Sequence, residues 1–135
     1  MPERVETVKE IYLAWGRQDI PAILERLHED VTWDDHHDVA KVPPWLRPRR
    51  GHDGVTQFFM ALSELEYETF VPYAFMTDGP YVVSLLNIAF TVKETGTRVE
   101  TDAEAHLWEF DEDGRVRSLR HLVDTHAHVD AWRGA

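Results

Sequence analysis

The second half of the chain alternates strand-like runs with short turn sequences, and this pattern restricts the possible folds more than any other feature. Runs rich in Val, Phe, Thr and Leu cover residues 67–77, 81–94, 97–110 and 115–132, and the sequences "DGP", "TG" and "DEDG" separate them. Short turn sequences between such runs are typical of antiparallel hairpins. We therefore predict a four-strand antiparallel meander that extends to the C-terminus.

The first half has the three- and four-residue apolar spacing of helices. This spacing predicts one helix that ends at Gly16, a second within residues 19–30 and a third over residues 52–65, with a short strand at residues 31–33. In the meander, apolar residues share one face of the second strand, which we expect the helices to cover: Val82, Leu86, Ile88, Phe90 and Val92. The predicted fold class is α+β, with three N-terminal helices packed on a strongly curved antiparallel sheet that forms a cone with an internal pocket.

Composition narrows the class of protein. The 135 residues suffice for one domain, predicted to cover residues 1–135, and a hydrophobic content of 43% is enough for a packed core and excludes disorder. The 25 Asp and Glu against 14 Lys and Arg give a net charge of −11, which argues against nucleic acids and anionic membranes as partners. The chain has no Cys and no apolar run near the ~20 residues of a membrane helix. We expect a soluble cytoplasmic protein.

The stretch "VTWDDHHD" at residues 31–38 holds the candidate general base. If the strand continues through Asp35, alternation places Val31, Trp33 and Asp35 on the inward face. Burial among apolar side chains raises the pKa of a carboxyl group toward the range that suits a general base. The alternative is that the strand ends at Trp33 and residues 34–38 form a solvated loop.

The order of elements resembles the SnoaL-like and ketosteroid-isomerase-like proteins of the nuclear transport factor 2-like superfamily, also called cystatin-like cones. The resemblance rests on a first helix, the short "DIPAIL" helix, the "EDVTWDD" strand, a proline-rich loop, the "GHDGVTQFF" helix, and strands that include "HLWEFDEDGRV". It covers nearly the whole chain and implies the cone fold and a homodimer that packs through the outer face of the sheet. Isomerases, polyketide cyclases, epoxide hydrolases, dehydratases and binding modules share this fold, so the resemblance alone selects no reaction.

Ketosteroid isomerases place three functional groups at positions that can be matched here. Their general base is an Asp at the end of the first strand, and its place falls on Asp35, sixteen residues after Asp19. The place of their oxyanion-hole Tyr falls on Ile11, with Tyr12 beside it, and Ala105 stands where their second donor is an Asp. Steroid isomerisation by that set of residues is therefore not expected, and cyclase-type or hydrolytic chemistry stays open.

Several other polar residues are candidates for acid–base work. Tyr12, His37 and His121 are candidates to donate a hydrogen bond to an enolate oxygen. His121 is also a candidate to pair with Asp124, although simple alternation places these two on opposite faces, and a surface salt bridge is the alternative. A hairpin closed at "DEDG" brings His106 near His121, and the register decides whether their face lines the pocket or a dimer interface.

We expect neither a metal nor a cofactor. His36, His37 and Asp38, like His126 and His128, are close in sequence but do not supply three or four convergent ligands. The sequence contains no nucleophile motif, no phosphate-binding glycine loop and no dinucleotide fingerprint. Any chemistry is therefore predicted to be cofactor-independent.

The pocket wall is expected to come from residues that also form the core: Trp15, Trp33, Trp45, Phe58, Phe59, Phe90 and His106. Such a wall suits a small apolar ligand. The leading prediction is acid–base chemistry of the isomerase, cyclase or lyase type, in which Asp35 removes a proton next to a carbonyl group. The alternative is a non-catalytic module that binds a small ligand or dimerises.

Overall fold

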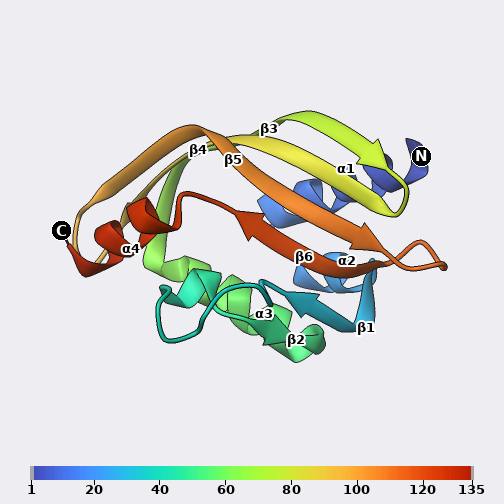
Figure 1. Ribbon diagram of the computed structural model, residues 1–135, viewed down its shortest axis with the longest axis horizontal. Helices are drawn as coiled ribbons and strands as arrows, with labels where there is room; N and C mark the ends of the chain where they lie inside the picture. The colour runs from blue at the N-terminus through green and yellow to red at the C-terminus, as the bar shows by residue number, and fades with distance from the viewer. Residues whose placement is uncertain (1, 135) are drawn as a thin grey trace.

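A computed structural model describes residues 2–134 as a curved six-strand sheet with helices on its concave side (Figure 1). The strand order is β2-β1-β6-β5-β4-β3. The helices and strands of this range are α1 (Pro2–Gly16), α2 (Ile20–Leu24), β1 (Leu27–Trp33), β2 (Arg49–Arg50), α3 (Gly51–Ala61), β3 (Leu65–Asp78), β4 (Tyr81–Val92), β5 (Arg98–Phe110), β6 (Val116–Leu122) and α4 (Thr125–Arg133), with 3-10 turns at Pro44–Leu46 and Leu62–Glu64. None of the described helices combines the length and apolar character needed to cross a bilayer.

The predicted meander is confirmed, but the sheet is not purely antiparallel. β3, β4, β5 and β6 pair antiparallel in sequence order, and the apolar face predicted for β4 is buried. β1, however, pairs parallel with β6, with Thr32 opposite Ser118. These two strands are far apart in the sequence, so no tight turn fixes their relative direction. The sheet is therefore mixed.

The second predicted helix is shorter than its apolar spacing indicates. α2 ends at Leu24, and β1 already begins at Leu27, inside the range predicted as helical. Asp19 caps α2 by accepting a hydrogen bond from Ala22 N at 3.2 Å. Leu27 is buried and pairs with Val116 at the start of the parallel ladder. This apolar strand residue lies three positions after Leu24, which is why the spacing resembled a longer helix.

The last predicted strand is also too long. It ends at Leu122, and Thr125–Arg133 form α4 instead. Asp124 caps this helix by accepting a hydrogen bond from Ala127 N at 3.1 Å, and Gly134 ends it with a φ of 77°. The two caps favour a helix where apolar alternation predicted a strand.

A buried chain of polar groups fastens α4 to the sheet. The Trp45 indole N–H donates to His128 Nδ1 at 3.0 Å, and His128 Nε2 lies 2.9 Å from Glu104 Oε1 on β5. An indole only donates, so Nδ1 accepts and Nε2 carries the ring proton toward the carboxylate. His126, two residues away, is exposed and pairs with Asp130 at 3.0 Å. On a strand, His126 and His128 would point to the same face, but on α4 His126 is exposed and His128 is buried.

Candidate functional site

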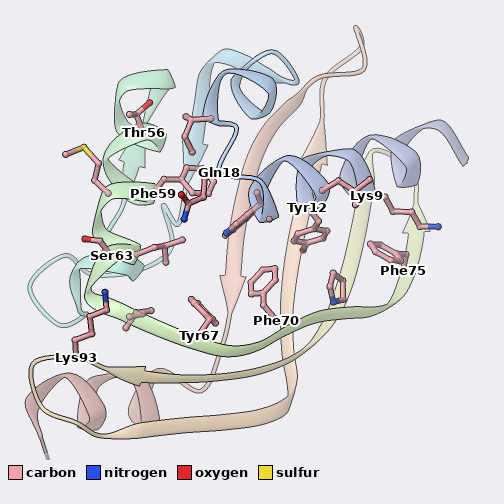
Figure 2. A pocket seen from close by; sticks show the side chains of 18 residues that line it. Lys9, Tyr12, Gln18, Thr56, Phe59, Ser63, Tyr67, Phe70, Phe75 and Lys93 are labelled. Atoms are coloured by element: carbon pink, nitrogen blue, oxygen red, sulfur yellow. The ribbon is translucent and has the colours of Figure 1, made fainter.

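A cavity of about 1170 Å³ opens between α1, α3 and β3 (Figure 2). Its wall is largely aromatic: Tyr12, Trp15, Phe59, Tyr67, Phe70 and Phe75. Gln18, Thr56 and Ser63 add uncharged polar groups, and Lys9 and Lys93 are the charged residues that line it within the described part of the chain. This size and this mostly apolar lining are those of a small-molecule site.

Tyr12 connects the cavity to a buried chain of hydrogen bonds. The apolar stripe of α1 turns Tyr12 inward, where Oη lies 2.6 Å from His106 Nδ1 and 2.6 Å from Ser84 Oγ. The Trp108 indole N–H donates to the same Ser84 oxygen at 3.2 Å. Every hydroxyl proton of this chain has an acceptor when Ser84 donates to Tyr12 and Tyr12 donates to His106. Trp108, which can only donate, is the fixed end of this chain.

The ionisation of the two central groups fits that direction. Burial raises the pKa of the Tyr12 hydroxyl above its usual value, although hydrogen bonds from Ser84 and Trp108 oppose the rise. Burial, reinforced by the nearby charge of His121, lowers the pKa of His106 well below its usual value. Tyr12 therefore keeps its proton and His106 stays neutral, so its Nδ1 is free to accept.

A second buried pair lies next to this chain. Asp34, which has no exposed surface, accepts hydrogen bonds from His121 N and His121 Nδ1, both at 2.7 Å. The sheet register places His121 opposite His106, and the two ring centroids are 4.5 Å apart. Burial by itself lowers the pKa of His121, but the Asp34 carboxylate, with a smaller contribution from Glu104, raises it overall. A buried carboxylate thus holds the imidazole at Nδ1 and leaves Nε2 for proton transfer.

An aromatic layer separates this pair from the cavity. Trp15 lines the cavity and stacks on His106, with 6.1 Å between the ring centroids. Phe59 lines it as well, and Phe58, whose ring centroid is 5.0 Å from that of Phe59, lies against the His121 ring at 5.2 Å. The His121 pair therefore sits one layer of side chains behind the cavity wall.

The inward position predicted for Asp35 is wrong. Asp35 is exposed, and its Oδ1 pairs with Arg120 Nε at 3.0 Å. β1 ends at Trp33, and Asp34 has a φ of 57°, in the left-handed region. This residue breaks the strand alternation, so the first of the two carboxylates turns inward and the second turns out. Asp tolerates the left-handed conformation better than most residues, but the sequence "DD" carries no signal of which one adopts it.

The partner of His121 is Asp34 rather than Asp124. Asp124 is exposed and caps α4, because the chain leaves the sheet before it. His37 lies half-buried, with Nε2 3.3 Å from the His121 carbonyl oxygen. Burial, together with the neighbouring His36, lowers the pKa of His37. His37 thus supports the backbone of His121 and does not line the cavity.

Two of the seven residues predicted to bind a ligand, Trp15 and Phe59, line the cavity. The other five are buried away from it: Trp33, Trp45, Phe58, Phe90 and His106. Their bulky rings pack on one another or on neighbouring rings, which fills that part of the concave side and leaves the cavity toward α1 and β3. Within residues 2–134, the buried Trp33 Nε1 has no hydrogen-bond partner, which is unusual for a buried donor.

Three metal-binding groups gather where β1 ends. One potential ligand atom from each of Asp34, His36 and His37 lies within 4.8 Å of the others. Carboxylates and imidazoles are ligands that zinc accepts. Both Asp34 oxygens, however, already accept hydrogen bonds from His121, so a metal would compete with that pair for the carboxylate. The expectation of no metal site stays a prediction.

A family model for SnoaL-like domains matches residues 8–119. The chain belongs to the SnoaL-like family. A nuclear transport factor 2-like protein from Burkholderia xenovorans is 27% identical to this SnoaL-like chain, over 97% of it and 96% of the other chain, with a TM-score of 0.82. TerC, co-crystallised with polyporic acid, is 21% identical over 97% and 98% of the two chains, with a TM-score of 0.77.

A proposed SnoaL-like polyketide cyclase from Mesorhizobium loti is 17% identical to this SnoaL-like protein, over 88% of its chain and 97% of the other, with a TM-score of 0.68. No curated protein matches the chain. The family resemblance inferred from the order of elements is confirmed. The fold hosts many reactions, so the chemistry has to follow from the site.

Proposed function

We propose that this SnoaL-like protein binds a small, mostly apolar carbonyl compound and catalyses proton transfer next to the carbonyl group without a cofactor. The buried His121–Asp34 pair, one aromatic layer from the cavity, carries this proposal. His121 Nε2 takes the role of general base that was predicted for Asp35, and Asp34 orients the imidazole. The Trp33 indole N–H is the donor toward the developing oxyanion, because Tyr12 already donates its proton to His106. The reaction class is isomerase- or cyclase-type.

The proton and electron movements of the proposed reaction follow from the position of His121 Nε2, the ring nitrogen that Asp34 does not engage. Because Asp34 engages Nδ1 of His121, the proton goes to Nε2. The C–H electron pair forms a carbon–carbon double bond, and the carbonyl π pair moves onto oxygen to give an enolate. This oxygen would satisfy the Trp33 N–H, which has no partner in the described part of the chain. When the enolate is conjugated with a second double bond, return of the proton from His121 to the far carbon completes an isomerisation. When the enolate carbon instead attacks a second carbonyl group, a ring closes and the new alkoxide takes the proton from His121.

The ligand reaches His121 past the aromatic layer. Phe59, half-buried at the cavity wall, contacts the rings of Trp15 and Phe58 at 4.8 and 5.0 Å between centroids. Rotation of the Phe59 side chain together with Phe58, which lies between Phe59 and His121, opens the route in this proposal. A ligand that fills the cavity then keeps water away from the base, which strengthens its electrostatic interactions.

Hydrogen–deuterium exchange at the α-carbons of 2-tetralone tests the proton transfer without knowledge of the natural substrate. We expect the wild-type protein to accelerate this exchange in D₂O, measured by proton NMR. His121→Asn is expected to slow the protein-catalysed rate at least about 100-fold, because it removes the base. Asparagine at this position retains an amide donor toward Asp34, which limits the structural effect.

The matched control is His126→Asn, which changes an exposed histidine on α4 and is expected to keep the wild-type rate. An unchanged rate in His121→Asn would exclude His121 as the base. A wild-type protein that binds 2-tetralone without accelerating exchange would support a non-catalytic binding module. The aromatic layer between His121 and the cavity is the observation that favours this second candidate function.

We also propose that a second copy of the chain covers the convex face of the sheet. Outward positions on three adjacent strands carry apolar residues in register, with Leu85 opposite Ala105 and Ala105 opposite Leu122. Exposed apolar side chains extend this patch across β3 to β6: Val71, Tyr73, Met76 and Leu122. Exposed apolar patches of this kind mark interaction sites.

Light scattering after size exclusion tests this dimer. We expect the wild-type mass to be that of two chains, and Leu122→Glu to give one chain, because a buried unpaired carboxylate opposes association. Val39→Glu is the control, since Val39 is similarly exposed but lies in the loop after β1, away from the patch. A wild-type protein with the mass of one chain would contradict the proposal.

A further inference from the structure

The charged residues of the cavity wall are all positive, in a strongly acidic chain. The protein has 25 Asp and Glu, a net charge of −11 and only three lysines. Two of the three, Lys9 and Lys93, line the cavity, whereas no Asp, Glu or Arg among the described residues does. A cavity with cations and no carboxylate favours a ligand that carries negative charge.

The two lysines mark opposite ends of the cavity (Figure 2). Lys93 lies at the end near α3 and Lys9 at the end near α1, with the rings of Tyr67, Phe70 and Phe75 distributed between them. Aromatic side chains of this kind contact flat apolar surfaces well. The wall therefore suits an elongated aromatic body with a charged group at one end.

The two ammonium groups differ in how far they are already neutralised. Lys9 Nζ lies 3.7 Å from Glu6 Oε1 and sits 5.3 Å from the centre of the Phe75 ring. Within residues 2–134, Lys93 Nζ has no ion-pair partner, while its backbone N–H is held by the Glu64 carbonyl oxygen at 3.0 Å. Lys93 is thus the uncompensated cation of the cavity.

We infer that the ligand is an amphipathic organic monoanion, with an aromatic or polycyclic body along the ring-lined wall and a carboxylate or ionised hydroxyl group paired with Lys93. This inference rests on the proposed function in treating the cavity as the substrate site, and it narrows the carbonyl substrate to one with an acidic group. Lys93 is remote from Tyr12 in Figure 2. Anchoring the acidic end there lays the aromatic body along the ring-lined wall, and such remote contacts orient the rest of a ligand.

Calorimetric binding of 2-naphthoate and 2-naphthamide tests the inference, because the two compounds share a ring system and differ in charge. We expect the wild-type protein to bind 2-naphthoate about fivefold more tightly, and the difference to shrink as salt is added. Lys93→Gln is expected to abolish this preference and to leave the affinity for 2-naphthamide unchanged. Lys41→Gln is the matched control: it removes the same charge from the third lysine, which is exposed beside Asp38 and lies outside the cavity.

Equal dissociation constants for the two compounds in the wild-type protein would overturn the anionic ligand but not the proposed catalysis, because exchange into 2-tetralone requires no charged group. A preference that survives in Lys93→Gln would overturn the assignment to Lys93. Failure of both compounds to bind would overturn this inference together with the role of the cavity in the proposed function.

Discussion

Replacing Asp34 with alanine is expected to lower the free energy of unfolding by about 3–5 kcal/mol, whereas the same change at the adjacent Asp35 should lower it by less than about 1 kcal/mol. Asp34 is fully buried and accepts two hydrogen bonds from His121, so its loss leaves an imidazole and a backbone N–H buried without an acceptor. The side chains of Asp35 and Arg120 are 45% and 44% exposed, and solvent screens their attraction. Urea denaturation near neutral pH measures both losses.

Asp34→Asn provides an intermediate reference for the two losses of unfolding free energy. The amide keeps the shape of the carboxylate and one oxygen acceptor, so we expect a loss between those of the two alanine variants. The contrast between neighbouring positions is informative because both substitutions remove the same charge. Equal losses for Asp34→Ala and Asp35→Ala would contradict the buried pair on which the proposed function depends.

The free energy of unfolding is expected to be highest near the usual histidine pKa of ~6.5 and to fall on both sides by up to about 1.4 kcal/mol per pH unit. Burial and His121 lower the pKa of His106, so its contribution is present above that pH and is lost as the pH falls toward its lowered pKa. Burial opposes protonation of His121, but Asp34 raises its pKa overall. The contribution of His121 is therefore present at lower pH and is lost as the pH rises through the raised pKa.

Two variants test separately the fall in the free energy of unfolding on the acidic side (the acid limb) and on the alkaline side (the alkaline limb). The measurement is urea denaturation from about pH 5 to about pH 8. His106→Asn offers Tyr12 an oxygen acceptor in place of Nδ1 and should flatten the acid limb. A small slope should remain, because burial also lowers the pKa of His37. His121→Asn should flatten the alkaline limb. An acid limb that is unchanged in His106→Asn would contradict a neutral, buried His106.

Local sequence patterns were sufficient for the elements whose structure depends on near neighbours. The turn sequences between β3, β4, β5 and β6 set their antiparallel order, because a short turn fixes the direction of the strand that follows. The helical stripe of α1 turned Tyr12 toward the interior for a similarly local reason. Where two local signals competed, as at the C-terminus, caps at Asp124 and Gly134 outweighed apolar alternation.

The sequence by itself determined the α+β class, the meander, the family and the inward-facing Tyr12. Only the tertiary structure decided which carboxylate is buried, because Asp34 and His121 are 87 residues apart and meet through the parallel pairing of β1 with β6. It also decided which aromatic residues line the cavity and that two of the three lysines face it. The physical reason is that strand register and the end of a strand are set by long-range packing, and a shift of one residue reverses which side chain points inward.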